Sequence, residues 1–274
     1  MVQRTVFFVS DQTGVTAETL GHSLLTQFDG LEFRPVTVPF VDSLDKVDQL
    51  VTRIAETTTE SGVRPIVFAS LVDEKLRARL QGCDALVLDF FEAFLAPLEH
   101  EIGAMSSHAL GKAHRMADAA TYNLRIDSIN YALAADDGHS THHYNEADVI
   151  LTGVSRSGKT PTCLYLALQY GIFAANYPLA EEDLESGSLP ERLVPFKDRL
   201  YGLTISPERL RQIRLERRSV GRYASAQQVS FELRAAERLF KRYNIPYIDT
   251  TRCSVEEIAS TILNVTGIER RVRP

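Results

Sequence analysis

Residues 147–171 read ADVILTGVSRSGKTPTCLYLALQYG and contain the segment GVSRSGKT, which fits the pattern G-x-x-x-x-G-K-[ST]. In this pattern, glycines let backbone N–H groups approach phosphate oxygens, a lysine neutralises the terminal phosphate, and a hydroxyl group coordinates Mg²⁺. The mechanism requires a strand before the loop and a helix after it. The apolar run DVILTG and the run TPTCLYLALQYG meet that requirement. The sequence therefore predicts a nucleotide phosphate site, and a structural glycine turn is the alternative.

The predicted nucleotide-binding residues are the eight residues of this loop: Gly153, Val154, Ser155, Arg156, Ser157, Gly158, Lys159 and Thr160. Within the loop, Lys159 is a candidate catalytic residue because its ammonium group would neutralise the terminal phosphate. Thr160 is the candidate ligand for a Mg²⁺ cofactor. The positive end of the helix that follows would strengthen anion binding.

An acidic strand after the loop, the usual source of a second Mg²⁺ ligand, is missing. The run LYGLTIS ends in Ser206, and Asp249 in PYIDTT comes late. A motor ATPase or a regulatory GTPase would ordinarily carry that strand, so the small-molecule kinases with a phosphate loop are the better analogy. In those enzymes a mobile helix bearing arginines closes over the transferring phosphoryl group.

The segment SPERLRQIRLERRSVGRY, residues 206–223, is typical of such a helix. Arginine offers planar, permanently charged donors to phosphate oxygens, and Arg217 is our candidate catalytic arginine. The alternative is a solvated amphipathic helix in which Glu208 and Glu216 form local ion pairs. The other arginines of the segment are Arg209, Arg211, Arg214, Arg218 and Arg222.

The segment DDGHSTHHY, residues 136–144, supplies two further candidate catalytic residues, Asp136 and Asp137. One carboxylate could hold Mg²⁺ or act as the base for an attacking hydroxyl group. A strand separates the aspartates from the loop, so they reach it only if residues 138–146 fold back or a second subunit contributes them. The alternatives are a polar turn and a metal cluster of His139, His142 and His143.

A second group of polar residues follows the first predicted strand, in SDQTGVTAETLG. Open α/β sheets bind ligands where such strands end. Asp11, Thr13 and Gly14 could therefore contact a phosphate or a partner protein. Alternatively, the aspartate and threonine supply a turn and a helix cap.

Composition limits the classes of partner. The 274 residues carry a net charge of −6, which gives a nucleic-acid partner no global electrostatic support. Nothing approaches 18 consecutive apolar residues and no signal pattern opens the chain, so we expect neither a membrane partner nor a membrane span. The three cysteines lie far apart and are typical of free thiols in the cytoplasm.

Apolar strands alternate with amphipathic helices over residues 1–105, which predicts an α/β domain with a parallel sheet. Residues 106–146 are predicted as a connecting segment with a short helical part. The alternation resumes over residues 147–274 and predicts a second, kinase-like α/β domain built around the phosphate loop. Ser254 and Glu257 have the spacing of a capping box, which predicts the start of the last helix.

The order of several motifs resembles one family. SDQTGVTAETLG, YNLRIDSINYALAADDG, ILTGVSRSGKTPTCLYLA, AANYPL and LYGLTISPERLRQIRLERR occur in turn. Together they resemble the pyruvate, water dikinase (phosphoenolpyruvate synthetase) regulatory proteins, which are relatives of the pyruvate, phosphate dikinase regulatory proteins. The resemblance covers almost the whole chain, and the block around GVSRSGKTPT is far more specific than a bare phosphate loop.

The resemblance implies a bifunctional serine/threonine kinase and phosphorylase. Such a protein phosphorylates and inactivates a threonine of phosphoenolpyruvate synthetase, with ADP as the donor. It also removes that phosphate with inorganic phosphate as co-substrate and releases pyrophosphate. Residues 153–160 would bind ADP. The family usually reads His-Asp-Asp-Gly where this chain has Ala135 before Asp136, Asp137 and Gly138, which leaves the aspartates as the better candidates.

Other functions remain compatible with the same residues. Pyruvate, phosphate dikinase is an alternative protein substrate, because the two families share these motifs. The loop and the arginine-rich segment alone would also suit a kinase for a small metabolite. A third hypothesis is a nucleotide-sensing module that binds its partner and catalyses no reaction. A homo-oligomer is compatible with the sequence.

Overall fold

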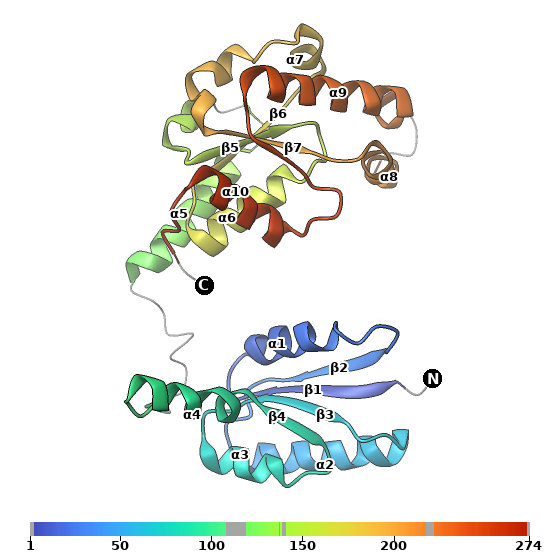
Figure 1. Ribbon diagram of the computed structural model, residues 1–274, viewed down its shortest axis with the longest axis vertical. Helices are drawn as coiled ribbons and strands as arrows, with labels where there is room; N and C mark the ends of the chain where they lie inside the picture. The colour runs from blue at the N-terminus through green and yellow to red at the C-terminus, as the bar shows by residue number, and fades with distance from the viewer. Residues whose placement is uncertain (1–2, 108–118, 137, 139–140, 218–221, 273–274) are drawn as a thin grey trace. The chain divides into compact units, whose positions relative to one another are not determined.

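The computed structural model describes residues 3–107, 119–136, 138, 141–217 and 222–272 (Figure 1). The chain forms two compact units, Met1–Arg115 and Met116–Pro274. Each unit contains one four-stranded sheet in which every paired strand is parallel to its neighbour. The predicted α/β class with parallel sheets is thus confirmed.

The first unit has the strand order β2-β1-β3-β4. Its two central strands are buried along almost their whole length because helices cover both faces of the sheet (Figure 1). Helices α1 and α4 pack on one face, and α2 and α3 pack on the other. The elements are β1 (Arg4–Ser10), α1 (Val15–Leu25), β2 (Phe33–Val38), α2 (Leu44–Ser61), β3 (Ile66–Ser70), α3 (Glu74–Gln81), β4 (Leu86–Asp89) and α4 (Phe90–Ile102).

The second unit has the strand order β6-β5-β7-β8. One core cluster joins α5, α6 and α10 to one face of this sheet, and another joins α7, α9 and the two longer 3-10 helices to the opposite face. The strands are β5 (Val149–Gly153), β6 (Ala174–Pro178), β7 (Leu200–Thr204) and β8 (Tyr247–Asp249). The helices are α5 (Ala119–Ala134), η1 (Thr141–Glu146), α6 (Lys159–Tyr170), α7 (Glu181–Ser186), η2 (Glu191–Arg199), α8 (Pro207–Arg217), η3 (Arg222–Ala224), α9 (Ala226–Tyr243) and α10 (Val255–Thr266).

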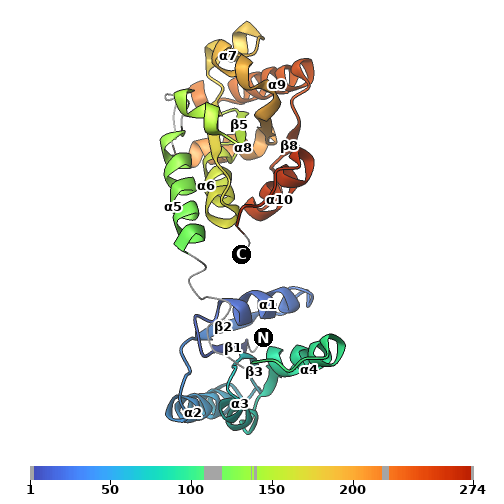
Figure 2. The same ribbon diagram turned by 90° about the vertical axis from the view of Figure 1, so that its left-hand side faces the viewer.

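Helix α5 lies within the segment that the sequence predicts as a connection, residues 106–146. It is 16 residues long and packs beside α6 (Figure 2). Tyr131 and Ala132 of α5 are buried in the cores of the second unit. Helix α5 therefore belongs to the second unit, because its side chains complete the core of that unit.

The start of the last helix, α10, agrees with the capping box predicted from the sequence. Ser254 and Glu257 form the capping box, with Ser254 N donating to Glu257 Oε2 at 2.7 Å and Glu257 N donating to Ser254 Oγ at 3.2 Å. Helix α8 is described from Pro207 to Arg217, and residues 218–221 of the arginine-rich segment lie outside the described residues. In the part of the chain that the structure describes, no helix is long and apolar enough to cross a membrane.

The strand order of the second sheet predicts where a ligand would bind, namely at the carboxyl end of β5. Strand β5 pairs with β6 on one side and with β7 on the other, so the chain leaves the carboxyl end of β5 where the strand order reverses. Ligands of open parallel sheets bind at such a switch point. The GVSRSGKT segment begins there, at the last residue of β5.

Gly153, the last residue of β5, is required by the packing of the sheet. Its φ is 144°, a value that favours glycine. A Cβ atom at this position would lie 2.3 Å from the backbone oxygen of Leu203 on β7. The strand and the loop can therefore meet β7 this closely only without a side chain.

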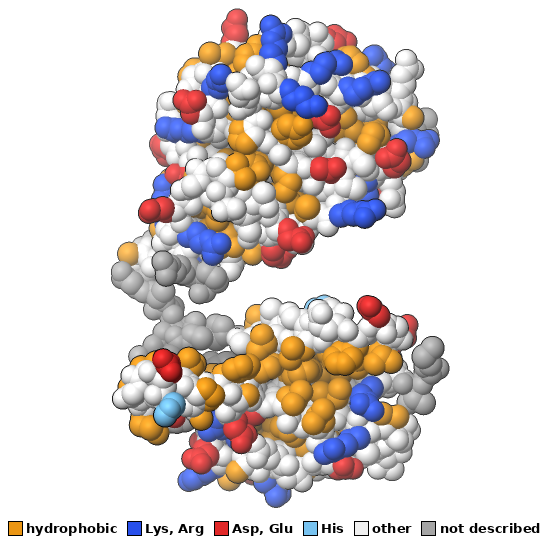
Figure 3. Space-filling model, in the orientation of Figure 1, with side chains coloured by type: hydrophobic (Ala, Val, Ile, Leu, Met, Phe, Trp, Pro, Cys, Tyr) orange, Lys and Arg blue, Asp and Glu red, His pale blue; other side chains and the backbone are white. Residues whose placement is uncertain are grey.

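The first unit also exposes a group of large apolar side chains (Figure 3). Large apolar side chains of α1, the loop after it, β4 and α4 are at least 39% exposed, namely Leu20, Leu24, Phe28, Leu31, Leu86, Leu88, Phe94, Leu98 and Ile102. Contiguous apolar surface of this kind is typical of interaction sites.

We predict that Gly153→Ala destabilises the second unit by more than ~2 kcal/mol, because the methyl group meets the Leu203 carbonyl in a backbone that cannot shift. Gly187→Ala is the matched control. Gly187 has a φ of 61° with open space at its Cβ position, so its substitution shows the cost of a left-handed residue without a steric contact, about 1 kcal/mol. Urea unfolding measures both. Equal losses would show that the contact with β7 is unimportant.

Candidate functional site

The loop from Gly153 to Thr160 has a backbone suited to anions. Gly153, Arg156 and Gly158 have φ values of 144°, 76° and 96°. Alternation between right-handed and left-handed residues is typical of backbone nests, in which successive N–H groups converge on an anion. Helix α6 begins immediately after Gly158, so its positive end faces the same loop.

Lys159 is folded back over the loop. Its side chain is only 4% exposed, and Nζ donates a hydrogen bond to the backbone oxygen of Val154 at 2.8 Å. The ammonium group is thus held between the ends of the loop rather than in solvent. This position lets it pair with an anion bound to the loop N–H groups.

Asp136 lies beside the last residue of the loop. Thr160 Oγ1 donates to Asp136 Oδ1 at 3.1 Å. Asn176 Nδ2, from β6, donates to the same oxygen at 2.5 Å and to Thr160 Oγ1 at 3.2 Å. Three polar side chains, from the end of α5, the start of α6 and the middle of β6, therefore meet at the mouth of the loop.

The chain reaches this arrangement by folding back within one subunit. Asn176 N donates to Ala135 O at 3.0 Å, which holds the turn after α5 against β6. Tyr144 OH donates to Asn176 O at 3.0 Å, and Tyr131 OH donates to His143 O at 2.8 Å. From the sequence, Asp136 is expected to reach the loop only if the chain folds back before β5 or a second subunit supplies the residue. The chain does fold back, so Asp136 reaches the loop within one subunit.

The cluster of Asp136, Thr160 and Asn176 suits a hard cation. Asn176 is 2% exposed, and its Oδ1 has no hydrogen-bond partner among the described residues. Mg²⁺ prefers oxygen ligands and is usually held by one or two carboxylates together with substrate phosphates and water. Asp136 and Thr160 supply a carboxylate and a hydroxyl oxygen of this kind, so the residues present fit the predicted Mg²⁺.

A buried arginine contacts the loop from the other side. Arg214 of α8 is fully buried, and its Nη2 donates to Ser155 O at 3.2 Å. Arg217, the arginine predicted from the sequence, is exposed at the last residue of α8. Among the described arginines of the segment, Arg214 is the one that hydrogen-bonds to the loop, because it lies one turn after the buried Leu210 on the inner face of the helix.

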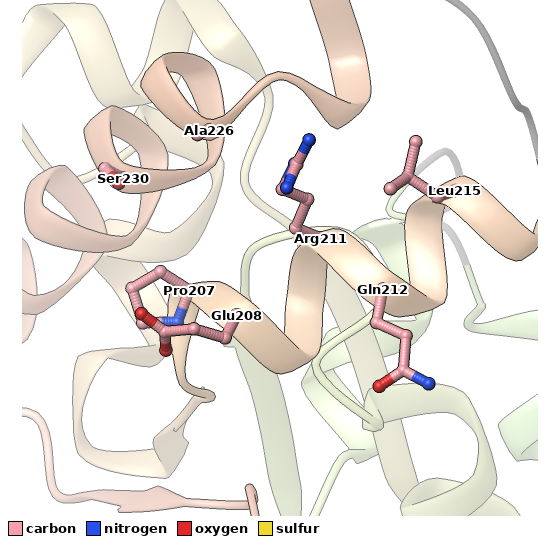
Figure 4. A pocket seen from close by; sticks show the side chains of 7 residues that line it. All are labelled: Pro207, Glu208, Arg211, Gln212, Leu215, Ala226 and Ser230. Carbon is pink, nitrogen blue, oxygen red and sulfur yellow. The ribbon is translucent and has the colours of Figure 1, made fainter.

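The outer face of α8 borders a groove of about 360 Å³ against the first turns of α9 (Figure 4). Arg211 and Leu215 of α8 line it opposite Ala226 and Ser230 of α9. Arg222, after the undescribed residues, pairs with Glu181 of α7 at 2.8 Å. The arginines of the segment thus have different environments rather than one shared role.

The remaining candidates near the loop are distributed as follows. Asp137 and His139 lie outside the described residues. His142 and His143 lie in η1 with ring centroids 4.0 Å apart. No group of three His, Cys, Asp or Glu side chains that could hold a metal ion occurs among the described residues. The three cysteines are free thiols.

Asp11, the candidate in the first unit, is 3% exposed and accepts a hydrogen bond from Val72 N at 2.7 Å. Burial raises the pKa of its carboxyl group above the usual value. The bond joins the loop after β1 to the loop after β3, which is a structural role. Thr13 is exposed, and Gly14 has a φ of 83° at the start of α1.

Asn176 and Thr250 are among the contact residues that were missed from the sequence. Asn176 is a buried polar residue in the strand AANYP. An asparagine inside an otherwise apolar strand is the sequence signal that could have identified it. Thr250 Oγ1, after β8, lies 3.1 Å from Ser157 O and 3.0 Å from Thr204 O, so its one hydroxyl hydrogen is shared between the two oxygens. It ties the loop to the edge of β7, and no local pattern distinguishes it.

Fold and site together define a two-unit α/β protein whose second unit carries a nest-like loop between a central parallel strand and a helix. Residues 6–263 match the model of the kinase/pyrophosphorylase family. The chain therefore belongs to the kinase/pyrophosphorylase family.

Curated relatives support the same assignment. A protein of Alcanivorax borkumensis is 52% identical over 272 residues, which are 99% of this chain and 100% of the relative. A protein of Alkalilimnicola ehrlichii is 54% identical over 270 residues, which are 98% of each chain. A protein of Legionella pneumophila is 48% identical over 271 residues, 99% of this chain and 100% of the relative. Each carries the name "Putative phosphoenolpyruvate synthase regulatory protein".

Proposed function

We propose that this protein regulates phosphoenolpyruvate synthase by reversible phosphorylation of a threonine. In one direction it transfers the β-phosphoryl group of ADP to the threonine hydroxyl, which leaves AMP and a phosphothreonine. In the other, inorganic phosphate takes the phosphoryl group from the phosphothreonine and leaves as pyrophosphate. Membership of the kinase/pyrophosphorylase family and the names of the relatives support this proposal. The free cysteines suit a cytoplasmic location.

The observation that carries the proposal is the convergence of Lys159 and Asp136 on the two ends of the nest-like loop. Transfer of a phosphoryl group needs little covalent chemistry from the protein and depends on positioning and charge stabilisation. With ADP as donor, the loop N–H groups and Lys159 would hold the phosphoryl group that moves, and in the other direction they would hold the inorganic phosphate that accepts it. Asp136 lies at the mouth of the loop, where an incoming hydroxyl group or phosphate would approach.

Mg²⁺, when bound by Asp136 and Thr160, would supply additional positive charge for the phosphate oxygens. Asn176 donates to both of these side chains and so fixes their mutual orientation. Asp137, outside the described residues, stays a predicted alternative for the carboxylate that acts on the hydroxyl group. Arg217, exposed at the last described residue of α8, stays a predicted catalytic arginine for the phosphoryl group.

The function is tested by following label from β-labelled ADP to purified phosphoenolpyruvate synthase. We expect phosphate on a threonine of the synthase with ADP as the donor and none from γ-labelled ATP in a preparation free of other kinases. Inorganic phosphate should then release the label as pyrophosphate. Transfer from ATP alone, or from ADP to a metabolite and not to the protein, would refute the proposal.

Lys159→Ala should lower the rate of ADP-dependent phosphorylation by about a hundredfold or more, because the closed loop loses its fixed cation. The fold should survive, since the side chain lies against the loop and not in an apolar core cluster. Lys241→Ala, at an exposed position on α9, is the control for loss of a lysine. A folded Lys159→Ala protein with a near-normal rate would remove the loop from the mechanism.

Asp136→Asn keeps the volume of the side chain and removes its charge. We expect both the kinase and the phosphorylase rates to fall about a hundredfold while ADP binding persists, because the loop N–H groups and Lys159 still hold the phosphates. Asp127→Asn, at an exposed position on the preceding helix α5, should leave both rates unchanged. If Asp136→Asn has normal rates, the hydrogen bonds of Asp136 to Thr160 and Asn176 are structural. Asp137 would then be the candidate for the catalytic carboxylate.

A further inference from the structure

Arg214 makes hydrogen bonds to three separate elements from a fully buried position. Nη2 donates to Ser155 O in the loop at 3.2 Å and to Glu232 Oε2 on α9 at 2.6 Å. Nη1 donates to Tyr223 O in η3 at 2.9 Å. The guanidinium group therefore links the phosphate loop to two elements that follow it in the chain by about 70 residues.

Tyr223 contacts both Arg214 and the loop. The Arg214 guanidinium carbon lies 4.1 Å from the centroid of the Tyr223 ring, a stacking contact. The Tyr223 hydroxyl group lies 3.0 Å from Ser155 Oγ. Ser155 is thus held at its backbone oxygen by Arg214 and at its side-chain oxygen by Tyr223.

These contacts determine the direction of the peptide between Ser155 and Arg156. In a trans peptide the C=O and N–H bonds point in opposite directions. Holding the Ser155 oxygen on the outside of the loop therefore turns the Arg156 N–H towards the inside. Arg156 has a φ of 76°, which is unfavourable for a residue with a side chain. The loop keeps this conformation only if its surroundings hold it.

The charge of Arg214 is matched locally rather than directed at a ligand. Glu232 pairs with it, and Gln228 Nε2 donates to the other oxygen of Glu232 at 3.1 Å. Burying such a pair stabilises a fold poorly compared with apolar side chains of similar size. Arg214 Nε has no partner among the described residues, which adds to that cost. Stability alone is therefore a weak reason for an arginine at this position.

We propose that Arg214, together with Tyr223, is a positioning residue that fixes the Arg156 N–H towards the phosphate bound in the loop. The inference rests on the proposed function, because it requires phosphate in this loop. Arg214 acts from outside and touches no phosphate. Its loss should weaken ADP and inorganic phosphate alike, because both would use the same N–H groups.

The first test is a double-mutant cycle with Tyr223→Phe and Ser155→Ala. Tyr223→Phe keeps the ring against Arg214 and removes only the hydroxyl contact, so the protein should fold. We expect about a fivefold rise in Kd for ADP and for inorganic phosphate by calorimetry, the size of one hydrogen bond. In the Ser155→Ala background the same substitution should have no further effect, because its partner is already missing.

The second test is Arg214→Lys, which keeps the charge opposite Glu232 but cannot donate to both backbone oxygens in one plane. We expect Kd for both ligands to rise about tenfold or more, at a temperature where circular dichroism shows a folded protein. Arg234→Lys, an exposed arginine on α9 that donates to Ser230 O of its own helix, is the matched control and should bind as wild type.

The outcomes separate the inference from the proposed function. Wild-type protein that binds neither ADP nor inorganic phosphate overturns both. Wild-type binding with unchanged Kd values in Tyr223→Phe overturns the inference alone, as does an additive cycle. A lower melting temperature with unchanged Kd values would assign Arg214 and Tyr223 a structural role only, which also overturns it. If Arg214→Lys fails to fold, the Tyr223→Phe cycle decides.

Discussion

The hydrogen bonds that join Asp136 to Thr160 and Asn176 organise the second unit around its loop. They close a contact between the end of α5 and the start of α6, 24 residues apart in the chain. To make it, residues after α5 must run the length of the sheet before β5 begins, and η1 fills that return path. Tyr131 and Tyr144 hold the return through hydrogen bonds from buried rings. A carboxylate that precedes the strand thereby lies beside the loop that follows it.

A second constraint comes from the loop backbone. If N–H groups converge on an anion, the carbonyl groups of the same peptides must point outwards, and buried carbonyl groups need donors. Two side chains from distant parts of the unit supply them: Arg214 of α8 for Ser155 and Thr250, after β8, for Ser157. Within the loop itself, Lys159 donates to Val154 O. The outer surface of the loop is therefore held by distant parts of the unit, and not by its own sequence alone.

This distinction explains how far the sequence could predict the structure. The alternating strands and helices, the position of the loop and the capping box at Ser254 follow from local patterns, and each appears in the structure. The importance of Arg214 over its neighbours was not predictable, because arginines occur on several sides of α8 and packing of Leu210 decides which side faces inwards. Likewise, α5 gave only a weak periodic signal, and its burial depends on α6 rather than on its own pattern.

One rigid loop is also a physical reason why two opposite reactions could share a site under the proposed function. The terminal phosphate of ADP and a free phosphate ion present the same oxygens to the same N–H groups and to Lys159. A loop that is held from outside does not have to change conformation to bind either ligand. The conformation of the loop therefore favours neither ADP nor inorganic phosphate. The two ligands differ in the nucleoside, which lies beyond the loop, and in the state of the threonine that meets them. Discrimination between the two directions must then come from groups around the mouth of the loop, where Asp136 lies, and not from the loop itself.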